Sequence, residues 1–171
     1  MNVRKPTHLL LLFLGFILLF FVSCGYRFSE TQKVYKTLAV PVMENMSGET
    51  GISAIITNSF ISEMMRFHGV KIADPETADC VLRGVITNVT FRTVVRETSH
   101  LTEAREVVVS IDLTLKNREG KTVWAVKSMT DSELYYVRSE KELLRSAILK
   151  AVEKLARRMA ERAALSIGSN F

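Results

Sequence analysis

The chain has 171 residues, of which 47% are hydrophobic and 24% charged, and its formal net charge is +5 at pH 7. This length is enough for one compact domain with its own core, and the modest positive excess suits an anionic surface without requiring nucleic acid as a partner. Three histidines and two cysteines, with no Cys-x-x-Cys or His-x-x-x-His spacing, provide no metal-binding motif. Glycine-rich phosphate-binding loops are absent from the sequence, so no cofactor is expected.

The first 24 residues predict a bacterial lipoprotein signal peptide. A basic pair near the start precedes an uncharged apolar stretch at residues 9–22. A helix of that length is about 20 Å long, too short for a hydrocarbon core of about 30 Å. Ser23 and Cys24 follow, which are the small residue and the cysteine at which such signals are cleaved and acylated. The pattern predicts removal of residues 1–23 and lipidation of Cys24; an uncleaved anchor and an ordinary secretory signal are the alternatives.

The residues around the cysteine add detail to this interpretation. Phe21 replaces the leucine that is usual three places before the cysteine. Gly25, rather than aspartate, follows the cysteine, and by resemblance to enterobacterial sorting rules this predicts the outer membrane. If Cys24 is acylated, only Cys80 remains, so no intramolecular disulfide is expected. The apolar neighbours of Cys80 favour a buried thiol.

A tether, a strand and a helix open the mature chain. Residues 24–36 are polar and aromatic without clear periodicity, and we expect them to link the acylated cysteine to a single domain at residues 37–171. Residues 37–42 predict a strand. Apolar residues spaced by three and four predict an amphipathic helix over residues 52–67, and a short strand is expected at residues 70–73.

Three long strands are predicted next. The alternation within residues 80–96 changes phase, which indicates a bulge near Thr87-Asn88 or apolar cover on both faces. Residues 106–116 alternate cleanly between apolar and polar side chains. The turn at residues 117–120 predicts a hairpin that connects this strand to a third one over residues 121–136.

The chain ends in a second amphipathic helix. Ser139 and Glu142 have the spacing of a capping box, and the apolar stripe that follows continues to about Ile167. The order of elements predicts an α+β fold. It is a two-layer sandwich, in which two amphipathic helices cover one face of a mainly antiparallel, four-stranded sheet.

Taken in order, these segments resemble the LptE family of lipopolysaccharide-assembly lipoproteins, in the divergent form found outside the enterobacteria. The resemblance spans residues 24–167. It is carried by Cys24-Gly25-Tyr26-Arg27-Phe28, Leu38-Ala39-Val40-Pro41-Val42, Glu44-Asn45, the helix at residues 52–66, Ala78-Asp79-Cys80-Val81-Leu82-Arg83-Gly84, residues 107–115, residues 120–124 and the C-terminal helix.

The resemblance implies a protein without enzymatic activity that partners a large outer-membrane β-barrel, LptD. Members of the family lie largely inside that barrel as a plug, help it to fold, and bind lipopolysaccharide during its delivery to the cell surface. A compact α/β body suits a wide lumen that would otherwise be filled with water. Two alternatives remain: an envelope lipoprotein of a secretion or scaffold complex that recruits periplasmic partners, and a hydrolase that uses a Cys80–His68 pair.

A basic group on a predicted β hairpin is the first candidate site. Arg92, Arg96 and Arg105 flank the polar tip at residues 97–101. If the strands pair around that tip, Arg96 and Arg105 approach each other, and clustered like charges indicate an anionic partner. We therefore expect lipopolysaccharide contact here. The alternative is that the arginines pair with neighbouring glutamates: Glu97, Glu103 and Glu106.

A basic ridge on the last helix is the second candidate site. Its members recur every four residues: Lys150, Lys154, Arg158 and Arg162. They could contact lipid A phosphates, the barrel wall or phospholipid head groups. The favoured interpretation is a solvated face that Glu153 and Glu161 partly neutralise.

Three aromatic residues of the third long strand are weaker candidates. Trp124, Tyr135 and Tyr136 could contact acyl chains or barrel residues. Ordinary core packing is the favoured interpretation, because large aromatic side chains dominate the burial of apolar surface in most domains.

Overall fold

The computed structural model describes residues 35–96, 103–136 and 141–169. All of them belong to one compact unit, residues 32–171. The predicted signal peptide, Cys24, Gly25 and most of the predicted tether therefore lie outside the described residues. So do Ser139 of the capping box and the hairpin tip.

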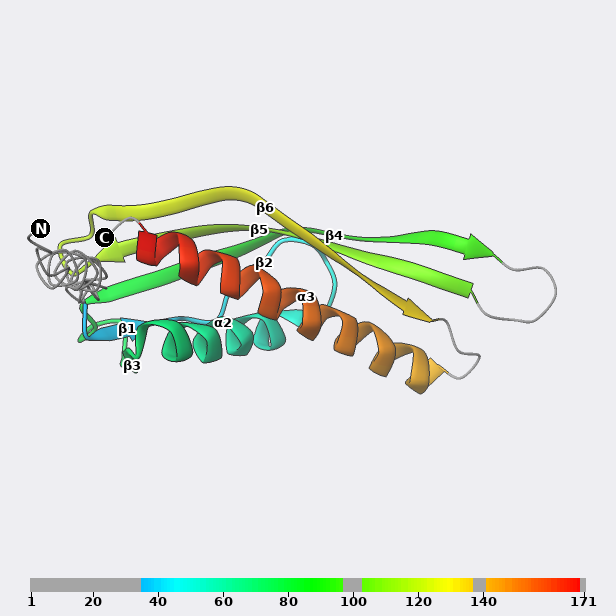
Figure 1. Cartoon of the computed structure of the whole chain (residues 1–171), viewed down its shortest axis with the longest axis horizontal. Helices are drawn as coiled ribbons and strands as arrows, with labels where there is room; N and C mark the ends of the chain where they lie inside the picture. Colours follow the sequence, from blue (N-terminus) through cyan, green and yellow to red (C-terminus); the bar gives the residue numbers. More distant parts are fainter. Residues whose placement is uncertain (1–34, 97–102, 137–140, 170–171) are drawn as a thin grey trace, which may run out of the picture. The chain divides into compact units, whose positions relative to one another are not determined.

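Within the residues that the structure describes, the sheet has six strands rather than the predicted four. Their order is β3-β1-β4-β5-β6, and β2 pairs with β4 off this path (Figure 1). The bounds are β1 Thr37–Ala39, β2 Glu44–Asn45, β3 Lys71–Ile72, β4 Cys80–Arg96, β5 Glu103–Asn117 and β6 Thr122–Tyr136. β4, β5 and β6 form an antiparallel meander. β1 runs parallel to β3 and β4, and β2 runs parallel to β4, so the sheet is mixed.

The prediction of a mainly antiparallel, four-stranded sheet is thus wrong in strand number and misses the parallel pairs. A strand that returns to the same sheet through a helix can run parallel to the strand it left, and α2 (Ile52–His68) provides such a crossover after β1. β2 and β3 have two residues each, too few to show a period in the sequence.

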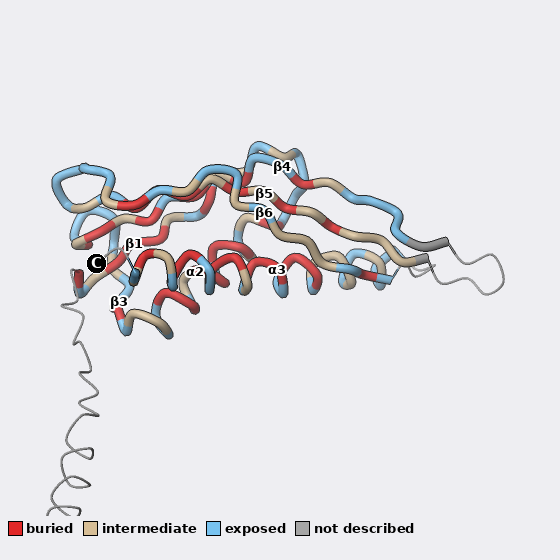
Figure 2. The backbone as a smooth tube through the Cα atoms, turned by 45° about the horizontal axis from the view of Figure 1, so that its top comes forward, coloured by how far each residue is buried: buried red, intermediate tan, exposed pale blue. Residues whose placement is uncertain are grey.

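Both helices cover the same face of the sheet, as predicted (Figure 2). We call this side the helix face and the opposite side the open face. α2 buries Ile56 and Phe60, and α3 (Lys141–Ser169) buries Leu155 and a row of alanines. They meet the alternate apolar residues of β5 from Val107 to Leu115, which have no exposed surface. Among the described helices, none combines the length and the apolarity needed to cross a bilayer.

The predicted bulge in β4 is confirmed. The register with β5 shifts between Ile86 and Asn88, which changes the phase of the strand at Thr87. Ile86 faces the helices before the bulge, and Val89 is buried after it. A second irregularity lies beside Val94. The bulges explain why one strand shows two alternation phases in its sequence.

β6 contains a strained residue. Ser128 has a φ of 52°, and it is the only non-glycine residue with positive φ in the described part of the chain. Asp112 on β5 supports this conformation, because its Oδ1 accepts a hydrogen bond from the Ser128 amide at 2.8 Å and its Oδ2 accepts one from Lys127 Nζ at 2.8 Å. These two bonds, first that of Lys127, lower the pKa of Asp112.

The variant Ser128→Gly is expected to raise the free energy of unfolding by about 1 kcal/mol, because glycine adopts positive φ without the steric cost of a Cβ atom. Urea unfolding followed by circular dichroism measures the change. Ala125→Gly in the same strand is the matched control and should lower stability by roughly 0.5–1 kcal/mol. Equal stability of the two variants would contradict a strained Ser128.

Asp79 joins the start of β1 to the start of β4. Its Oδ2 accepts hydrogen bonds from the amides of Lys36 and Thr37, each at 3.0 Å, and its own amide donates to Thr37 Oγ1 at 2.9 Å. Arg118 Nη2 lies 3.3 Å from Oδ1. The bond from the Lys36 amide, followed by those from Thr37, lowers the pKa of Asp79. We call these contacts of Asp79 with Lys36 and Thr37 the Asp79 clip.

The Asp79 clip should make stability depend on pH. The pKa of Asp79 is lower in the folded state, so its contribution is present above the ordinary aspartate pKa and is lost as pH falls through the folded pKa. Wild type should melt at a higher temperature than Asp79→Ala at pH 7, and the difference should shrink below about pH 4. Thermal melts between pH 7 and pH 3 test this. Asp74→Ala, at an exposed turn, is the control and should change little. Identical melting of wild type and Asp79→Ala at pH 7 would contradict the clip.

Candidate functional site

The far half of the meander extends past the short strands and past α2 (Figure 1). We define it as the distal sheet: residues 88–96 of β4, 103–110 of β5 and 130–136 of β6. It contains all three arginines of the first candidate site. The two strands pair around the hairpin tip as the sequence predicts.

The register changes the expected arrangement of these arginines. Arg92 lies opposite Glu106, and Arg96 lies opposite Glu103. Arg96 is therefore not directly opposite Arg105, which lies two residues further along β5 than Glu103. The six residues between the strands place residue 103, rather than residue 105, across from Arg96. A residue with a carboxylate is thus the cross-strand neighbour of both Arg92 and Arg96.

The arginines also lie on different faces of the distal sheet. Arg105 is two residues from buried Val107, so alternation places it on the helix face, opposite Tyr135 of β6. Arg92 is exposed on the open face. Its neighbour Glu106 accepts a hydrogen bond from Ser132 Oγ at 2.6 Å. The side chain of Arg96 lies outside the described part. Arg92 and Arg105 therefore do not form one cluster.

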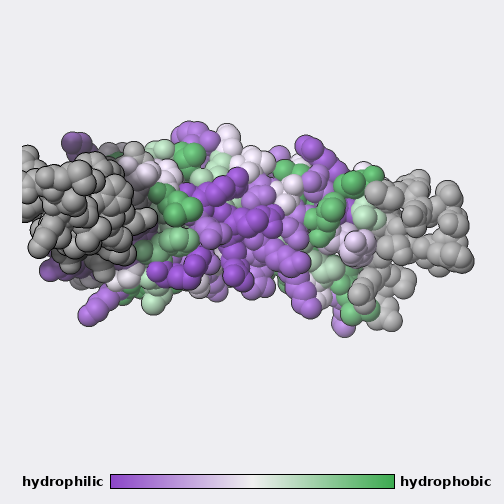
Figure 3. Space-filling model, in the orientation of Figure 1, coloured by the Kyte–Doolittle hydropathy of each residue, from purple (hydrophilic) through white to green (hydrophobic). Residues whose placement is uncertain are grey.

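Exposed apolar side chains accompany the arginines, a feature that the sequence analysis missed. They come from three structural elements at this end of the domain: Phe91 and Val94 on β4, Leu134 and Tyr136 on β6, and Leu143 on α3. Tyr136 is 61% exposed and Leu134 is 53% exposed, although both lie within a regular strand. Figure 3 shows hydrophobic surface towards this end of the molecule, beyond a hydrophilic band that crosses the helices. The signal in the sequence was the apolar pair on alternate positions 134 and 136 of β6.

The aromatic candidates separate into core and surface residues. Trp124 is buried, and its Nε1 donates a hydrogen bond to Ser166 Oγ on α3 at 3.1 Å. Tyr135 is buried and packs edge-to-face against Phe91, with ring centroids 6.3 Å apart. Core packing is therefore the role of Trp124 and Tyr135. Tyr136, next in sequence, points to the open face.

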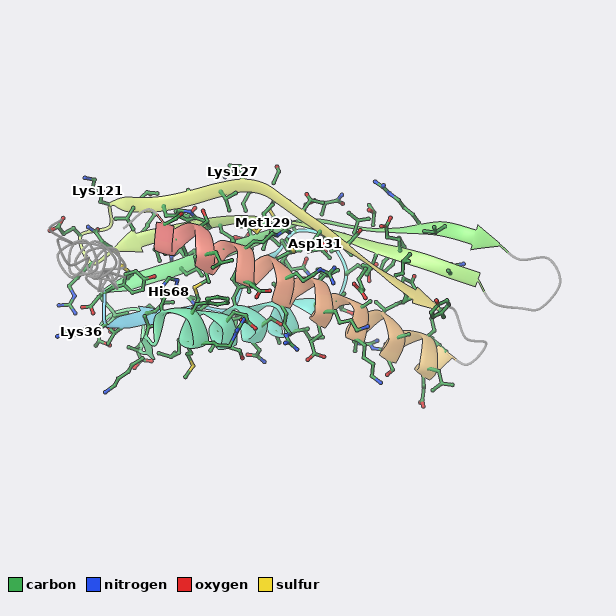
Figure 4. The ribbon with its side chains drawn as sticks, viewed as in Figure 1. Lys36, His68, Lys121, Lys127, Met129 and Asp131 are labelled. Carbon is green, nitrogen blue, oxygen red and sulfur yellow. The ribbon has the colours of Figure 1, made fainter. Side chains whose placement is uncertain are left out.

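The basic ridge of α3 is largely paired with β6. Arg158 Nη1 donates to Glu133 Oε2 at 2.7 Å, and its Nε and Nη2 each lie 3.2 Å from Asp131. Lys154 lies 3.5 Å from Glu133, and Arg162 lies 3.3 Å from Asp131. Asp131 is labelled on β6 in Figure 4. The hydrogen bonds that Arg158 donates to Asp131, followed by the one it donates to Glu133, raise the pKa of Arg158.

The partners that neutralise the ridge are therefore acids of the sheet and not the expected acids of the same helix. Glu161 instead lies 3.4 Å from Arg66 of α2. Lys150, the remaining ridge residue, is exposed. Asp131 and Glu133 occupy alternate positions on the helix face of β6, where the sequence showed acids in place of apolar residues. That departure from the apolar pattern was the available signal.

A groove between α2 and α3 holds a further group of charged side chains. It is lined by Glu63, Arg66, Lys154, Arg157, Arg158 and Glu161. Glu63 is buried, and its Oε2 lies 2.6 Å from Arg66 Nη2. Its Oε1 forms a longer salt bridge with Arg157 Nε, at 3.8 Å. Four basic and two acidic side chains thus line the groove, and the salt bridges of Arg66 with Glu63 and Glu161 join the two helices. The two carboxylates compete with any external anion.

A match to a protein-family model identifies the family of the chain. The model of the LptE family, described as lipopolysaccharide assembly, matches residues 35–167. The chain belongs to the LptE family. This is a non-enzymatic family of lipopolysaccharide-assembly lipoproteins. A search of curated proteins with the sequence gave no match.

Solved structures share the fold of this LptE-family chain. An inferred lipoprotein from Caulobacter crescentus is 15% identical, with a TM-score of 0.51 over 75% of this chain and 89% of that one. A hypothetical protein from Chlamydia trachomatis is 8% identical, with a TM-score of 0.50 over 77% of this chain and 96% of that one. At these identities the likeness concerns the fold alone.

The LptE-family domain offers no support for the hydrolase alternative. Burial, and then the charge of Asp79, raises the pKa of the Cys80 thiol, which disfavours the reactive thiolate. His68 Nε2 lies 3.0 Å from the carbonyl oxygen of Ala164 and its ring faces Tyr35. No group of histidine, cysteine and acidic residues that could hold a metal ion occurs within residues 35–96, 103–136 and 141–169.

Proposed function

We propose that this protein is an outer-membrane lipoprotein, anchored on the periplasmic side through acylated Cys24, that plugs and assists an LptD-type barrel. We further propose that it binds lipopolysaccharide during delivery to the cell surface. Membership of the LptE family over residues 35–167 carries the proposal. An acyl anchor would hold the domain in the membrane that contains the barrel, which raises the effective concentration of one for the other.

The open face of the sheet supports a place inside a water-lined lumen. Its side chains are mostly polar and already hydrogen-bonded to one another: Thr87 Oγ1 donates to the Ser110 carbonyl at 3.1 Å, and the Ser110 and Thr130 hydroxyls lie 2.9 Å apart. Such a surface keeps its hydrogen bonds whether it faces water or the polar wall of a barrel.

The distal sheet supports contact with an anionic amphiphile. Arg92 and Leu134 are exposed on the same face, each beside Glu106 in the register of β4, β5 and β6. Tyr136 extends the apolar surface by two residues. A guanidinium recognises a phosphate group, and neighbouring apolar side chains accept an acyl chain. Lipopolysaccharide combines both groups. Arg105 on the helix face and Lys150 on α3 remain secondary candidates.

Two measurements test the proposal. The full-length protein should co-purify from membranes with a barrel protein in a one-to-one complex. Arg92→Glu with Leu134→Asp should weaken lipopolysaccharide binding by roughly tenfold or more, because one change repels phosphate and the other removes apolar contact. Arg83→Glu is the matched control, since Arg83 is exposed on the open face of the same strand outside the distal sheet. Wild-type affinity in the double variant would remove this site. A homo-oligomeric ring without a barrel would contradict the barrel partnership and favour a secretion or scaffold lipoprotein.

A further inference from the structure

The solvent side of α2 carries no charge over most of its length. Residues 52–62 contain no acidic or basic side chain. Exposed positions within them are Ala54, Asn58 and Ser62, which recur every four residues and so lie on one side of the helix. Met65, three residues further on, continues this side and is 48% exposed. We call the surface made by these four residues the α2 outer face.

The neighbouring helix has the ordinary surface of a helix that faces water. α3 lies beside α2 on the same face of the sheet (Figure 1), and it carries acidic and basic residues along its exposed side from Lys141 to Arg162. Surface helices normally present such charged residues opposite their apolar stripe. The α2 outer face departs from this pattern, which indicates that it meets a partner rather than bulk water.

The polar side chains of the α2 outer face offer hydrogen-bonding groups to such a partner. Buried Ser59 satisfies its hydroxyl within the helix, since its Oγ donates to the Ile55 carbonyl at 2.9 Å. The side chains of Asn58 and Ser62 make no comparable bond with the residues that the structure describes. Their donors and acceptors point outward and can pair with polar groups of another molecule.

A second groove between α2 and α3 borders this face and adds a polar recess. Asn58 and Ser62 line it from α2, and Glu153 and Arg157 line it from α3. A partner on the α2 outer face can therefore insert polar side chains between the helices. Hydrocarbon would leave all of these polar groups without hydrogen-bonding partners, which argues against a lipid surface as the occupant.

We propose that the α2 outer face packs against the inner wall of the barrel protein; this inference rests on the proposed function. The lumen side of such a wall is polar. The small side chains of Ala54 and Ser62 let the wall approach the helix closely. Asn58 and Ser62 then exchange hydrogen bonds with the wall, and no charge on the outer face has to be stripped of water.

A second copy of this chain is a poorer occupant, because the face is small. α2 has 17 residues. Its outer face is therefore about 25 Å long and about 10 Å wide, or roughly 250 Å². Stable protein pairs bury about 800 Å² on each partner. The face alone cannot hold two free copies together, whereas a plug has further contacts with its barrel and is kept near the wall by the anchor.

Site-specific photocrosslinking of the full-length protein in cells tests the contact. With benzoylphenylalanine in place of Asn58, irradiation should crosslink the protein to the barrel. Crosslinks from this position to lipid, to a second copy or to residues 25–34 of the same chain, without the barrel, would overturn the inference. So would a barrel complex that forms and gives no crosslink from position 58. Failure of any complex to form would overturn the proposed function and this inference with it.

A pair of arginine variants provides a second test. Ser62→Arg should reduce the yield of the barrel complex roughly tenfold, because a long charged side chain would be buried against the wall without a partner. Thr122→Arg is the matched control, since Thr122 is an exposed hydroxyl residue of β6, outside the α2 outer face. Both positions are exposed, so both variants should keep cooperative melting. Wild-type yield with Ser62→Arg, or an equal loss with Thr122→Arg, would contradict the proposal.

Discussion

Replacing Cys24 with alanine should abolish palmitate labelling, abolish globomycin-sensitive processing and release the protein from the membrane fraction. In the proposed lipoprotein the Cys24 thiol is the group to which the acyl chain would be attached, and residues 9–23 contain no other cysteine. Each buried methylene of an acyl chain contributes about 0.8 kcal/mol to membrane binding, so losing the chains removes nearly all the anchoring energy. Fractionation and labelling of growing cells measure the effect.

The second cysteine is the control for that experiment. Cys80 is buried in the domain core, so Cys80→Ala should keep normal labelling and membrane attachment. Palmitate labelling that persists in Cys24→Ala would exclude a lipoprotein signal. Labelling that depends on Cys80 would contradict both the signal assignment and the buried position of that thiol.

Phe60→Ala should lower the free energy of unfolding by about 3–5 kcal/mol, the largest stability change we expect from one substitution in the domain. Phe60 has no exposed surface and lies on α2 where that helix covers the sheet. Truncation removes its apolar contacts and leaves a cavity between the two layers. Domains have about 5–15 kcal/mol of stability in total, so the variant should unfold at a much lower urea concentration.

A surface leucine provides the comparison for Phe60. Leu165 is 58% exposed on α3, so Leu165→Ala should change the unfolding free energy by less than about 0.5 kcal/mol. Similar urea midpoints for Phe60→Ala and Leu165→Ala would show that α2 does not pack on the sheet as described.

The core of the domain was predictable because long periodic segments record which face is buried. The alternation of β5 from Val107 to Leu115 and the helix stripe that contains Phe60 both match the buried residues. The bulge at Thr87 was predictable for the same reason, since a change of phase is visible over a long strand. The parallel pairs of β1, β2 and β3 were not, because strands of two or three residues carry no period and their direction is set by the chain connections.

The candidate sites depended on register, which the sequence leaves open. Whether Arg96 faces Arg105 or Glu103 depends on how the hairpin connection is centred, and a shift of one residue changes every pair. The partners of Arg158 come from β6, 25 to 27 residues earlier in the chain. Asp131 and Glu133 nevertheless indicated basic partners, because two acidic residues occupy positions of β6 on the helix face, where apolar residues are usual.

The Asp79 clip determines how mechanical load would enter the domain. A pull on the amino-terminal segment reaches the folded body at buried Tyr35 and at Lys36, whose amide donates a hydrogen bond to Asp79 at the base of β4. β4 is the strand that joins β1, β2 and β5, so the force is shared by the whole sheet at its point of entry. Breaking the clip with Asp79→Ala would let the first strand peel away before the rest responds.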